Sequence, residues 1–445
     1  MSQSAEDPAA STEESPLKRR HIAAATIGNA LEFYDFLIYT FFSIQIGHAF
    51  FPAQSAYGSL MLSLATFGAG FITRPIGAVI IGNYADRAGR RPAMILCFVL
   101  IGVAIVGMAV IPTYASIGIA APILAVIARM VQGFSLGGEI GSTTAYLMES
   151  VPANRRGFNV SWQGASQNMA LIAGGTVGVL LTAVLPPDAL DAYGWRMAFL
   201  LGAVTVPFGF WMRRNLPETL EKPGPLARVE AHTPSRLAVA RTHWRVIVLG
   251  LTVLASGTIT IYIFNYMVTY AQATLHMSAR VGFIAVTGGY LLGIPSTLLG
   301  GYLSDRHGRW PINVWGNFVF MLLIYPAFAW VTATGSVFAF IAAMALLSGV
   351  AKFFNGSVYA ALVESLPAAI RCSGFGTVYS LSIAVFGGTT QLVVTWLIHV
   401  TGSAMAPAWY MVAAAFIAQI ALMLLTESAP ARVRFAPEPA VAMAG

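Results

Sequence analysis

Charged residues inside long apolar segments are the first feature of this sequence that could do chemistry. The stretch LEFYDFLIYTFFSIQIG, which begins at Leu31, carries two carboxylates among aromatic and aliphatic residues, and three later apolar segments carry further charges. The six residues are Glu32, Asp35, Arg74, Arg129, Glu139 and Lys352. In a bilayer each unpaired charge near the midplane costs at least about 2.5 kcal/mol, so we expect these residues to pair or to face an internal cavity.

The charges of the three carboxylates and the three cations sum to about zero when all six residues are ionised. Such a region suits coupled binding of a proton and an anion. Glu32 and Asp35 are three residues apart, so on a helix they share one face. When a carboxylate takes up a proton the region becomes positive, and an organic anion then binds more favourably, so each ligand favours the other. The candidate proton-coupling residues are Asp35, Glu32, Arg129 and Glu139. The alternative is a structural ion pair that locks the first helix to the fourth.

An anionic substrate needs cationic partners, and Arg74 and Lys352 are the candidates. A guanidinium binds a carboxylate with two hydrogen bonds, and an ammonium supplies a point charge. Uncharged polar residues in the spans could add contacts to the substrate, and these are Gln163, Gln167, Tyr262, Asn265 and Asn355. The alternatives are hydrogen bonds between helices for the uncharged residues, and a snorkelling cation at a helix end for Arg74.

Membrane-spanning helices must position these residues. Of the 445 residues, 57% are hydrophobic and 10% are charged, which is not the composition of a soluble globular chain. A span needs roughly 20 apolar residues, and the sequence offers twelve such runs. Their expected ranges are 21–47, 57–83, 92–112, 118–148, 158–185, 195–213, 244–271, 280–303, 311–332, 336–365, 374–400 and 406–426. The sequence therefore predicts an all-α polytopic membrane protein with twelve transmembrane helices.

The positions of lysine and arginine predict how the chain is oriented. Apart from the three cations inside spans, nearly all of the 25 fall in loops on one side, and only Arg196 and Arg280 fall on the other. Such an excess marks the cytoplasmic side, so we expect both termini there, in the cell (cytoplasmic or inner) membrane. The net charge of +7 follows from this topology, and we expect no nucleic-acid partner. The expected partners are the lipid bilayer, protons and a small organic anion, and we expect a monomer.

Two motifs recur in the second half of the chain. The segment GNYADRAGRRP from Gly82 returns as GYLSDRHGRWP from Gly301, and ESVPANRRG from Glu149 returns as ESLPAAIRCSG from Glu364. We expect a cytoplasmic tail at 1–20, a six-helix half at 21–213, a cytoplasmic linker at 214–243, a second six-helix half at 244–426 and a cytoplasmic tail at 427–445. Two parallel halves with the substrate held between them is an arrangement of secondary transporters.

The repeated motifs predict a charged network at the cytoplasmic helix ends. Asp86 and Asp305 can accept hydrogen bonds from the N-terminus of a neighbouring helix, and nearby arginines can pair with glutamates across the bundle. The candidate gating residues are Asp86, Arg90, Glu149, Arg156, Asp305, Arg309, Glu364 and Arg371. The alternative for the arginines is that they only fix the topology.

The pattern Gly-x-x-x-Asp-Arg-x-Gly-Arg-Arg after the second span resembles the signature of the major facilitator superfamily, whose weaker copy follows the eighth span. GNALEFYDFLIY, ITRPIGAVIIGNYADRAGRRP, ARMVQGFSLGGEIG and SWQGASQ resemble its metabolite:proton symporters. SLMLSLATFGAGFITRPIGA and GWRMAF are most similar to the citrate and tricarballylate proton symporters of that branch. The resemblance covers essentially the whole chain. One departure is Lys352, where an apolar residue is expected in the citrate carriers.

The resemblance implies the major facilitator fold and proton-driven uptake of an organic anion, such as citrate or tricarballylate, by alternating access. It favours Asp35 as proton carrier, then Glu32 and Glu139, because Arg129 lies in a segment similar to the superfamily's proton-coupling RxxQG motif. The alternatives are a proton symporter of a monocarboxylate or of a zwitterion such as proline or betaine, and a membrane sensor that binds its ligand without moving it. We expect no enzymatic activity, no catalytic or metal-binding residue and no cofactor, since the proton gradient supplies the energy.

Overall fold

The protein is described by a computed structural model that covers residues 33–34, 38–88, 90–137, 144, 147–148, 151–214, 244–366 and 371–428. In the first half the helices are α2 (Ser43–Phe50), α3 (Ala56–Ile72), α4 (Arg74–Ala88), α5 (Arg90–Val110), α6 (Tyr114–Ile117), α7 (Ala120–Leu136), η1 (Ala153–Arg155), α9 (Arg156–Val184), α10 (Pro187–Ala189), η2 (Leu190–Gly194) and α11 (Trp195–Arg214). In the second half they are α13 (Trp244–Ala273), α14 (Ala279–His307), α15 (Arg309–Thr334), α16 (Val337–Glu364), α17 (Arg371–Ser382), η4 (Ile383–Gly387), α18 (Gly388–Thr401) and α19 (Ala406–Leu424).

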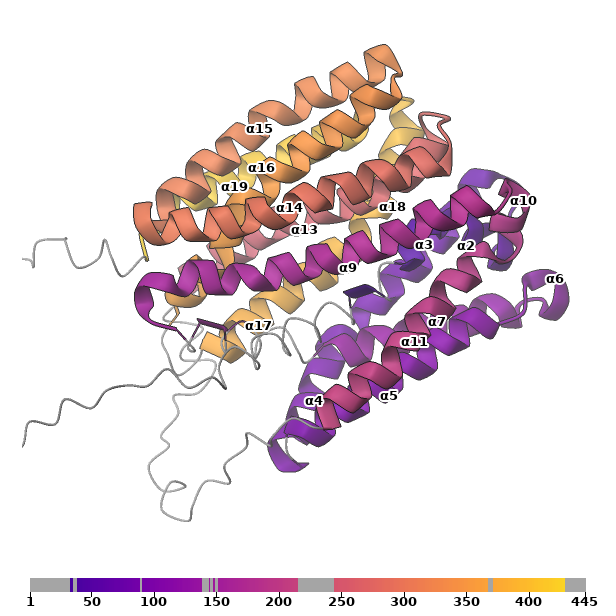
Figure 1. Ribbon diagram of the computed structural model, residues 1–445, viewed down its shortest axis with the longest axis horizontal. Helices are drawn as coiled ribbons and strands as arrows, with labels where there is room; N and C mark the ends of the chain where they lie inside the picture. Colours follow the sequence, from indigo (N-terminus) through magenta and orange to yellow (C-terminus); the bar gives the residue numbers. More distant parts are fainter. Residues whose placement is uncertain are drawn as a thin grey trace, which may run out of the picture.

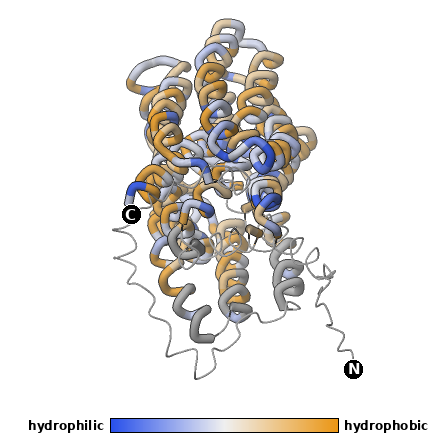
Figure 2. The backbone as a smooth tube through the Cα atoms, turned by 90° about the vertical axis from the view of Figure 1, so that its left-hand side faces the viewer, coloured by the Kyte–Doolittle hydropathy of each residue, from blue (hydrophilic) through white to orange (hydrophobic). Residues whose placement is uncertain are grey.

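Long apolar helices dominate the described ranges, which confirms the predicted all-α membrane class. Eight helices there are long and apolar enough to cross a bilayer, and two shorter apolar ones run over 95–110 and 120–136. Many large hydrophobic side chains on these helices point outward, among them Val184 and Phe338, each more than 70% exposed. Hydrophobic residues run along the length of the helices in Figure 2, as a lipid-facing surface requires.

The two halves lie side by side, with α9 of the first half running along α14 of the second (Figure 1). Small residues let these two backbones approach. A Cβ atom on Gly157 would lie 2.8 Å from the carbonyl oxygen of Gly301, and one on Gly175 would lie 2.2 Å from Thr287 Oγ1. Close small-residue contacts of this kind drive helix association in membranes. This α9–α14 seam joins the halves along most of their length.

A second seam joins α3 of the first half to α18 and η4 of the second. A Cβ on Gly68 would lie 2.7 Å from the carbonyl oxygen of Gly388, so the backbones touch near mid-helix. The Phe71 ring, one turn further along, packs against Tyr262 of α13 with centroids 5.5 Å apart. The two halves are therefore in contact along two seams, one between α9 and α14 and one between α3 and α18 with η4.

Two glycines of α14 give a matched test of helix packing in the second half. A Cβ on Gly300 would lie 1.6 Å from the carbonyl oxygen of Phe353 on α16, whereas a Cβ on Gly288 meets nothing within 4 Å. We expect Gly300→Ala to lower the free energy of unfolding by about 1–3 kcal/mol through overpacking. Gly288→Ala should be neutral or raise it by up to about 1 kcal/mol, because alanine favours the helix. Thermal unfolding in detergent measures both, and equal midpoints for the two variants would contradict this packing.

Candidate transport site

Arg129 of α7 is completely buried inside the first half. Its guanidinium carbon lies 4.7 Å from the centre of the Tyr39 ring and 4.9 Å from that of Phe67, and Nη1 donates to Gln132 Oε1 at 2.5 Å. Two aromatic faces stabilise a cation that has left water. The ring contacts and the hydrogen bond hold the guanidinium in one position deep in the bundle.

Arg74 is the first residue of α4, directly after the break between α3 and α4 at Thr73. The break is held by Thr73 Oγ1, which donates to the Met130 carbonyl of α7 at 2.7 Å. Arg74 is only 4% exposed, and its guanidinium carbon lies 4.8 Å from the Phe71 ring centre. Since Phe71 itself contacts the second half, Arg74 lies one ring away from the seam. This is the interior position that the sequence predicted.

A small cavity lies between the two halves near mid-helix. Its volume is about 30 Å³, and it is lined by Phe33, Gln167, Leu254, Gly257, Thr258, Ile261, Tyr262, Asn355, Tyr359, Tyr379 and Ile383. Three residues predicted to contact the substrate, Gln167, Tyr262 and Asn355, thus meet around one space. That space holds about one water, so the helices must separate before an organic anion fits.

Two further predicted contact residues are not among those lining this cavity. Gln163 accepts a hydrogen bond from Thr144 within the first half. Asn265 accepts one from the Tyr290 hydroxyl, with 2.6 Å between Tyr290 Oη and Asn265 Oδ1. Both amides therefore make the hydrogen bonds between helices that were the alternative interpretation.

Lys352 of α16 is 5% exposed and reaches toward the first half. A Cβ on Gly293 would lie 3.2 Å from both Lys352 Cγ and Asn168 Nδ2, so the absence of a side chain at Gly293 brings Lys352 beside Asn168 of α9. The lysine Nζ lies 5.2 Å from the Tyr290 ring centre. Within the part of the chain that the structure describes, Lys352 forms no ion pair or hydrogen bond. A buried ammonium without an acidic partner in these ranges is a ready contact for an anion.

The sequence reasoning missed Asn168, which neighbours the predicted Gln167. Asn168 Nδ2 donates to Thr297 Oγ1 of α14 at 3.3 Å, while its Oδ1 is buried without a hydrogen-bond partner. This amide oxygen lies beside the Lys352 side chain, so it can accept a hydrogen bond from a ligand or from the lysine itself. The sequence offered one signal for Asn168, which is its position in the middle of a span beside Gln167.

A charged cluster closes the arginine-rich end of the α9–α14 seam, the end at which α9 begins and α14 finishes. Both oxygens of Asp305 on α14 accept backbone N–H groups from the first turn of α9, from Gly157 and from Phe158, each at 2.8 Å. Arg309 Nη1 lies 2.8 Å from Asp305 Oδ1. A carboxylate at a helix N-terminus is favoured by the helix dipole as well as by these bonds. Asp305 therefore ties the two halves together, as the motif predicted for its contacts.

Arg309 joins this cluster to α16. Its Nε and Nη2 each donate to one oxygen of Glu364 at 3.1 Å, a two-bond contact, and its Nη1 also donates to Ser304 Oγ at 2.7 Å. Gly308 stands between α14 and α15 with φ +99°, a conformation that glycine adopts without strain, and this turn brings Arg309 back onto α14. The guanidinium is 2% exposed and satisfies two carboxylates at once.

Glu427, just after α19, was not predicted to take part in this network. Its two oxygens accept the backbone N–H groups of Arg309 and Trp310 at 2.9 and 3.1 Å, which caps α15. Ser428 Oγ donates to Glu364 at 3.2 Å. The start of the predicted C-terminal tail is thus fixed to the same charged cluster. The available signal was an acidic residue directly after the last span at the arginine-rich end.

Several predicted site residues lie outside the part of the chain that the structure describes. They are Glu32, Asp35, Glu139 and Glu149. For Asp86, Arg90 and Arg371 the structure describes the helices and not the side chains. Arg156 begins α9, and in the described ranges it forms no ion pair.

The family model described as Major Facilitator Superfamily matches residues 25–371. The chain belongs to the Major Facilitator Superfamily. Its sequence is 36% identical over 410 residues to a citrate-proton symporter of Klebsiella pneumoniae, with 91% of each chain covered. It is 30% identical to a proline/betaine transporter of Salmonella typhimurium, with 92% of this chain and 84% of the relative covered. A crystal structure of a D-xylose-proton symporter matches with a TM-score of 0.74 at 18% identity, covering 92% of this chain and 98% of that one.

Membership of this superfamily explains the architecture described above. The twelve-helix arrangement of two related halves is the major facilitator fold, as the repeated motifs predicted. The protein is a multi-pass membrane transporter and not an enzyme.

Proposed function

We propose that this transporter takes up an organic polycarboxylate, such as citrate or tricarballylate, together with protons by alternating access. The observation that carries the proposal is Lys352, a buried ammonium at the seam between halves with no acidic partner among the described residues. Arg74 supplies a second buried cation from the first half. Two cations in opposite halves suit a ligand with carboxylates at both ends, because such a ligand draws the halves together. The 36% identity to a citrate-proton symporter supports the same substrate class.

For proton coupling we propose Asp35 as the carrier, with Glu32 and Glu139 as further candidates. The rigid position of Arg129 between two aromatic rings supports this assignment, because a fixed guanidinium provides a charge against which a carboxylate can titrate. Protonation of the carboxylate would leave the interior more positive and so favour the anion. The two ligands then share one free-energy coupling, as symport requires.

For gating and topology we propose the arrangement that the sequence predicted. The arginine-rich end, with Asp305, Arg309 and Glu364, is the cytoplasmic gate, and both termini are cytoplasmic. The contact of Asp305 with α9 supports this role, since it must break before the halves part at that end. The domain limits at 1–20, 21–213, 214–243, 244–426 and 427–445 and the monomeric state belong to the same proposal.

Uptake into proteoliposomes tests the substrate class. The panel is citrate, tricarballylate, a dicarboxylate, a monocarboxylate, proline and betaine, each labelled and each measured with and without an inward proton gradient. We expect concentrative uptake of the tricarboxylates only with the gradient, and loss of accumulation when an uncoupler dissipates it. Preference for proline or betaine would replace the proposal with a zwitterion symporter, and binding without any accumulation would indicate a sensor.

A further inference from the structure

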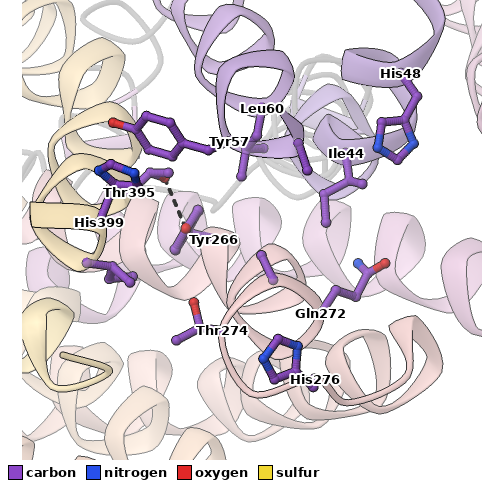
Figure 3. Close-up of a pocket in the computed structure, with 13 residues that line it drawn as sticks. Ile44, His48, Tyr57, Leu60, Tyr266, Gln272, Thr274, His276, Thr395 and His399 are labelled. Carbon is purple, nitrogen blue, oxygen red and sulfur yellow. Dashed lines mark hydrogen bonds between the residues drawn. The ribbon is translucent and has the colours of Figure 1, made fainter. Parts of the chain in front are cut away.

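A second and larger cavity lies at the end of the helices opposite to the charged cluster (Figure 3). Its volume is about 530 Å³, within the range of about 300–1,000 Å³ that is usual for small-molecule sites. Its walls come from both halves: α2 and α3 from the first, and α13, the loop after it and α18 from the second. We call it the outer vestibule, the space between His48, Tyr57, Tyr266, His276 and His399.

Three histidines line the outer vestibule, each from a different element. His48 is near the end of α2, His276 follows α13, and His399 is near the end of α18. Figure 3 shows the three rings on different walls of the cavity. Imidazole is the side chain that changes its charge between about pH 5 and 8, and either form donates at least one N–H bond. The walls of this space therefore carry three imidazole N–H donors.

His399 contacts the other half directly. Its ring stacks on Tyr57 of α3 with centroids 3.9 Å apart and planes 18° apart. His48 Nδ1 lies 3.4 Å from Asp191 Oδ2, and both side chains are about half exposed. Asp191 is therefore an acidic neighbour of one vestibule histidine.

His276 is held in an uncommon backbone conformation. Its φ of +54° is the one positive value at a non-glycine residue in the described ranges. The turn around it is fixed by Met277 N–H, which donates to the Ala271 carbonyl at 2.8 Å. Strained positions of this kind concentrate at functional sites, because the surrounding structure must hold them. Here the strain fixes an imidazole on the vestibule wall.

The vestibule is adjacent to the transport site. Tyr266 of α13 lines the vestibule and accepts a hydrogen bond from Thr395 Oγ1 at 3.0 Å. Tyr262, one helical turn away on α13, lines the small cavity between the halves. Four residues of α-helix rise about 6 Å, so one turn of α13 separates the two spaces. A ligand in the vestibule therefore lies about one helical turn from the small cavity between the halves, which we call the central site.

Few ionisable groups other than the histidines lie at this end of the described helices. Tyr57 and Tyr266 are the other titratable residues on the vestibule walls. The charged residues in the described loops and helix ends on this side are Asp188, Asp191, Arg196 and Arg280. Only Asp191 among them contacts a vestibule histidine. His48, His276 and His399 are thus the basic side chains on the vestibule walls.

We propose that the outer vestibule is a capture site for the carboxylate substrate, filled before the central site and strengthened by protonation of its three histidines. The inference rests on the proposed function and on the proposed orientation. Several donors on separate walls match a ligand with several carboxylates. The same acidity that drives symport would then also concentrate the anion at the mouth of the transporter.

Exchange kinetics in membrane vesicles test this site. Labelled external citrate exchanges for unlabelled internal citrate with equal pH on both sides, at pH 5.5 or 7.5. The triple variant His48→Gln, His276→Asn, His399→Gln keeps polar side chains, and asparagine tolerates the positive φ at position 276. In right-side-out vesicles at pH 5.5 we expect KM to rise about fivefold or more with kcat nearly unchanged, as loss of charge-assisted hydrogen bonds predicts. At pH 7.5 the variant and the wild type should agree.

Two controls separate the vestibule from the central site. In inside-out vesicles the substrate enters from the gate side, so KM of the triple variant should equal that of the wild type. His307→Gln, an exposed histidine at the end of α14, should change nothing in either orientation.

An unchanged KM at pH 5.5, an equal rise at both pH values, or an equal rise in both vesicle orientations would each overturn the capture site. If the triple variant does not fold, His48→Gln and His399→Gln are measured singly, and each must show part of the KM increase. Absence of exchange by the wild type with both citrate and tricarballylate would instead overturn the proposed function, and this inference with it.

Discussion

Replacing Lys352 with methionine should weaken binding of the preferred polycarboxylate by roughly 1.5–3 kcal/mol, the range for a hydrogen bond to a charged group. Because Lys352 has no acidic partner in the described part of the chain, the change leaves no carboxylate there without its counter-ion. Methionine also keeps the aliphatic contacts beside Gly293. Removing a buried charge should therefore leave the thermal midpoint equal or raise it. Titration calorimetry in detergent measures the affinity.

A second ligand makes the Lys352 prediction specific. An analogue with one carboxylate fewer should lose much less affinity in Lys352→Met, because it lacks a carboxylate to place against Lys352. Arg245→Met is the matched control, because Arg245 is an exposed cation at the start of α13. It should bind both ligands as the wild type does. Equal weakening of both ligands would mean that Lys352 acts through structure, and no weakening would remove the main support for a polyanionic substrate.

Much of the fold follows from the sequence because hydrophobic length and repetition are local signals. A run of about 20 apolar residues has few structures available in a bilayer. Described helices such as α9 (Arg156–Val184) and α16 (Val337–Glu364) accordingly agree with the predicted spans 158–185 and 336–365 to within a few residues. The recurrence of the motif around Asp305 predicted a carboxylate at a neighbouring helix N-terminus, and the structure contains that contact with Gly157 and Phe158. The motif carries its own geometry, since the Gly308 turn is part of it.

The sequence does not say which face of a helix meets which neighbour. For this reason some predicted site residues line the cavity between the halves and others do not. Gln163 and Gln167 stand one turn apart on α9, but Gln163 bonds to Thr144 inside its own half, while Gln167 lines the cavity between halves. Asn168 was overlooked because its contact with Lys352 depends on Gly293. The absence of a side chain at Gly293 leaves room for Lys352 to lie beside Asn168. Such contacts depend on tertiary packing, which no local pattern encodes.

The contacts of residues at helix ends also could not be predicted from the sequence. Histidines at helix ends and in loops are not part of a periodic pattern, so nothing in the sequence brings His48, His276 and His399 around one cavity. Glu427 lies 118 positions from Arg309 in the chain, and only the packing of α19 against α15 brings it to that helix end. Long-range contacts of single polar residues therefore required the structure.

The charged cluster gives the last prediction, that Asp305→Asn opens the arginine-rich end. Asparagine retains one acceptor oxygen, but its NH₂ group cannot accept the second backbone N–H of α9 and cannot pair with Arg309. Losing hydrogen bonds to a buried charge costs roughly 1.5–3 kcal/mol, which corresponds to about a tenfold or larger rise in the open fraction. Arg309 keeps its two bonds to Glu364, so the protein should still fold.

A cysteine at Ser161 reports the opening, in a background with Cys97 and Cys372 replaced by serine. Ser161 is 2% exposed, and its Cβ lies 2.8 Å from the position of a Cβ on Gly301, so it becomes accessible only when α9 leaves α14. Labelling by a water-soluble maleimide should be about tenfold faster in Asp305→Asn. Asp188→Asn removes the same charge at the opposite end and should label as the parent does. Equal labelling rates in all three proteins would leave Asp305 a structural contact that does not control the gate.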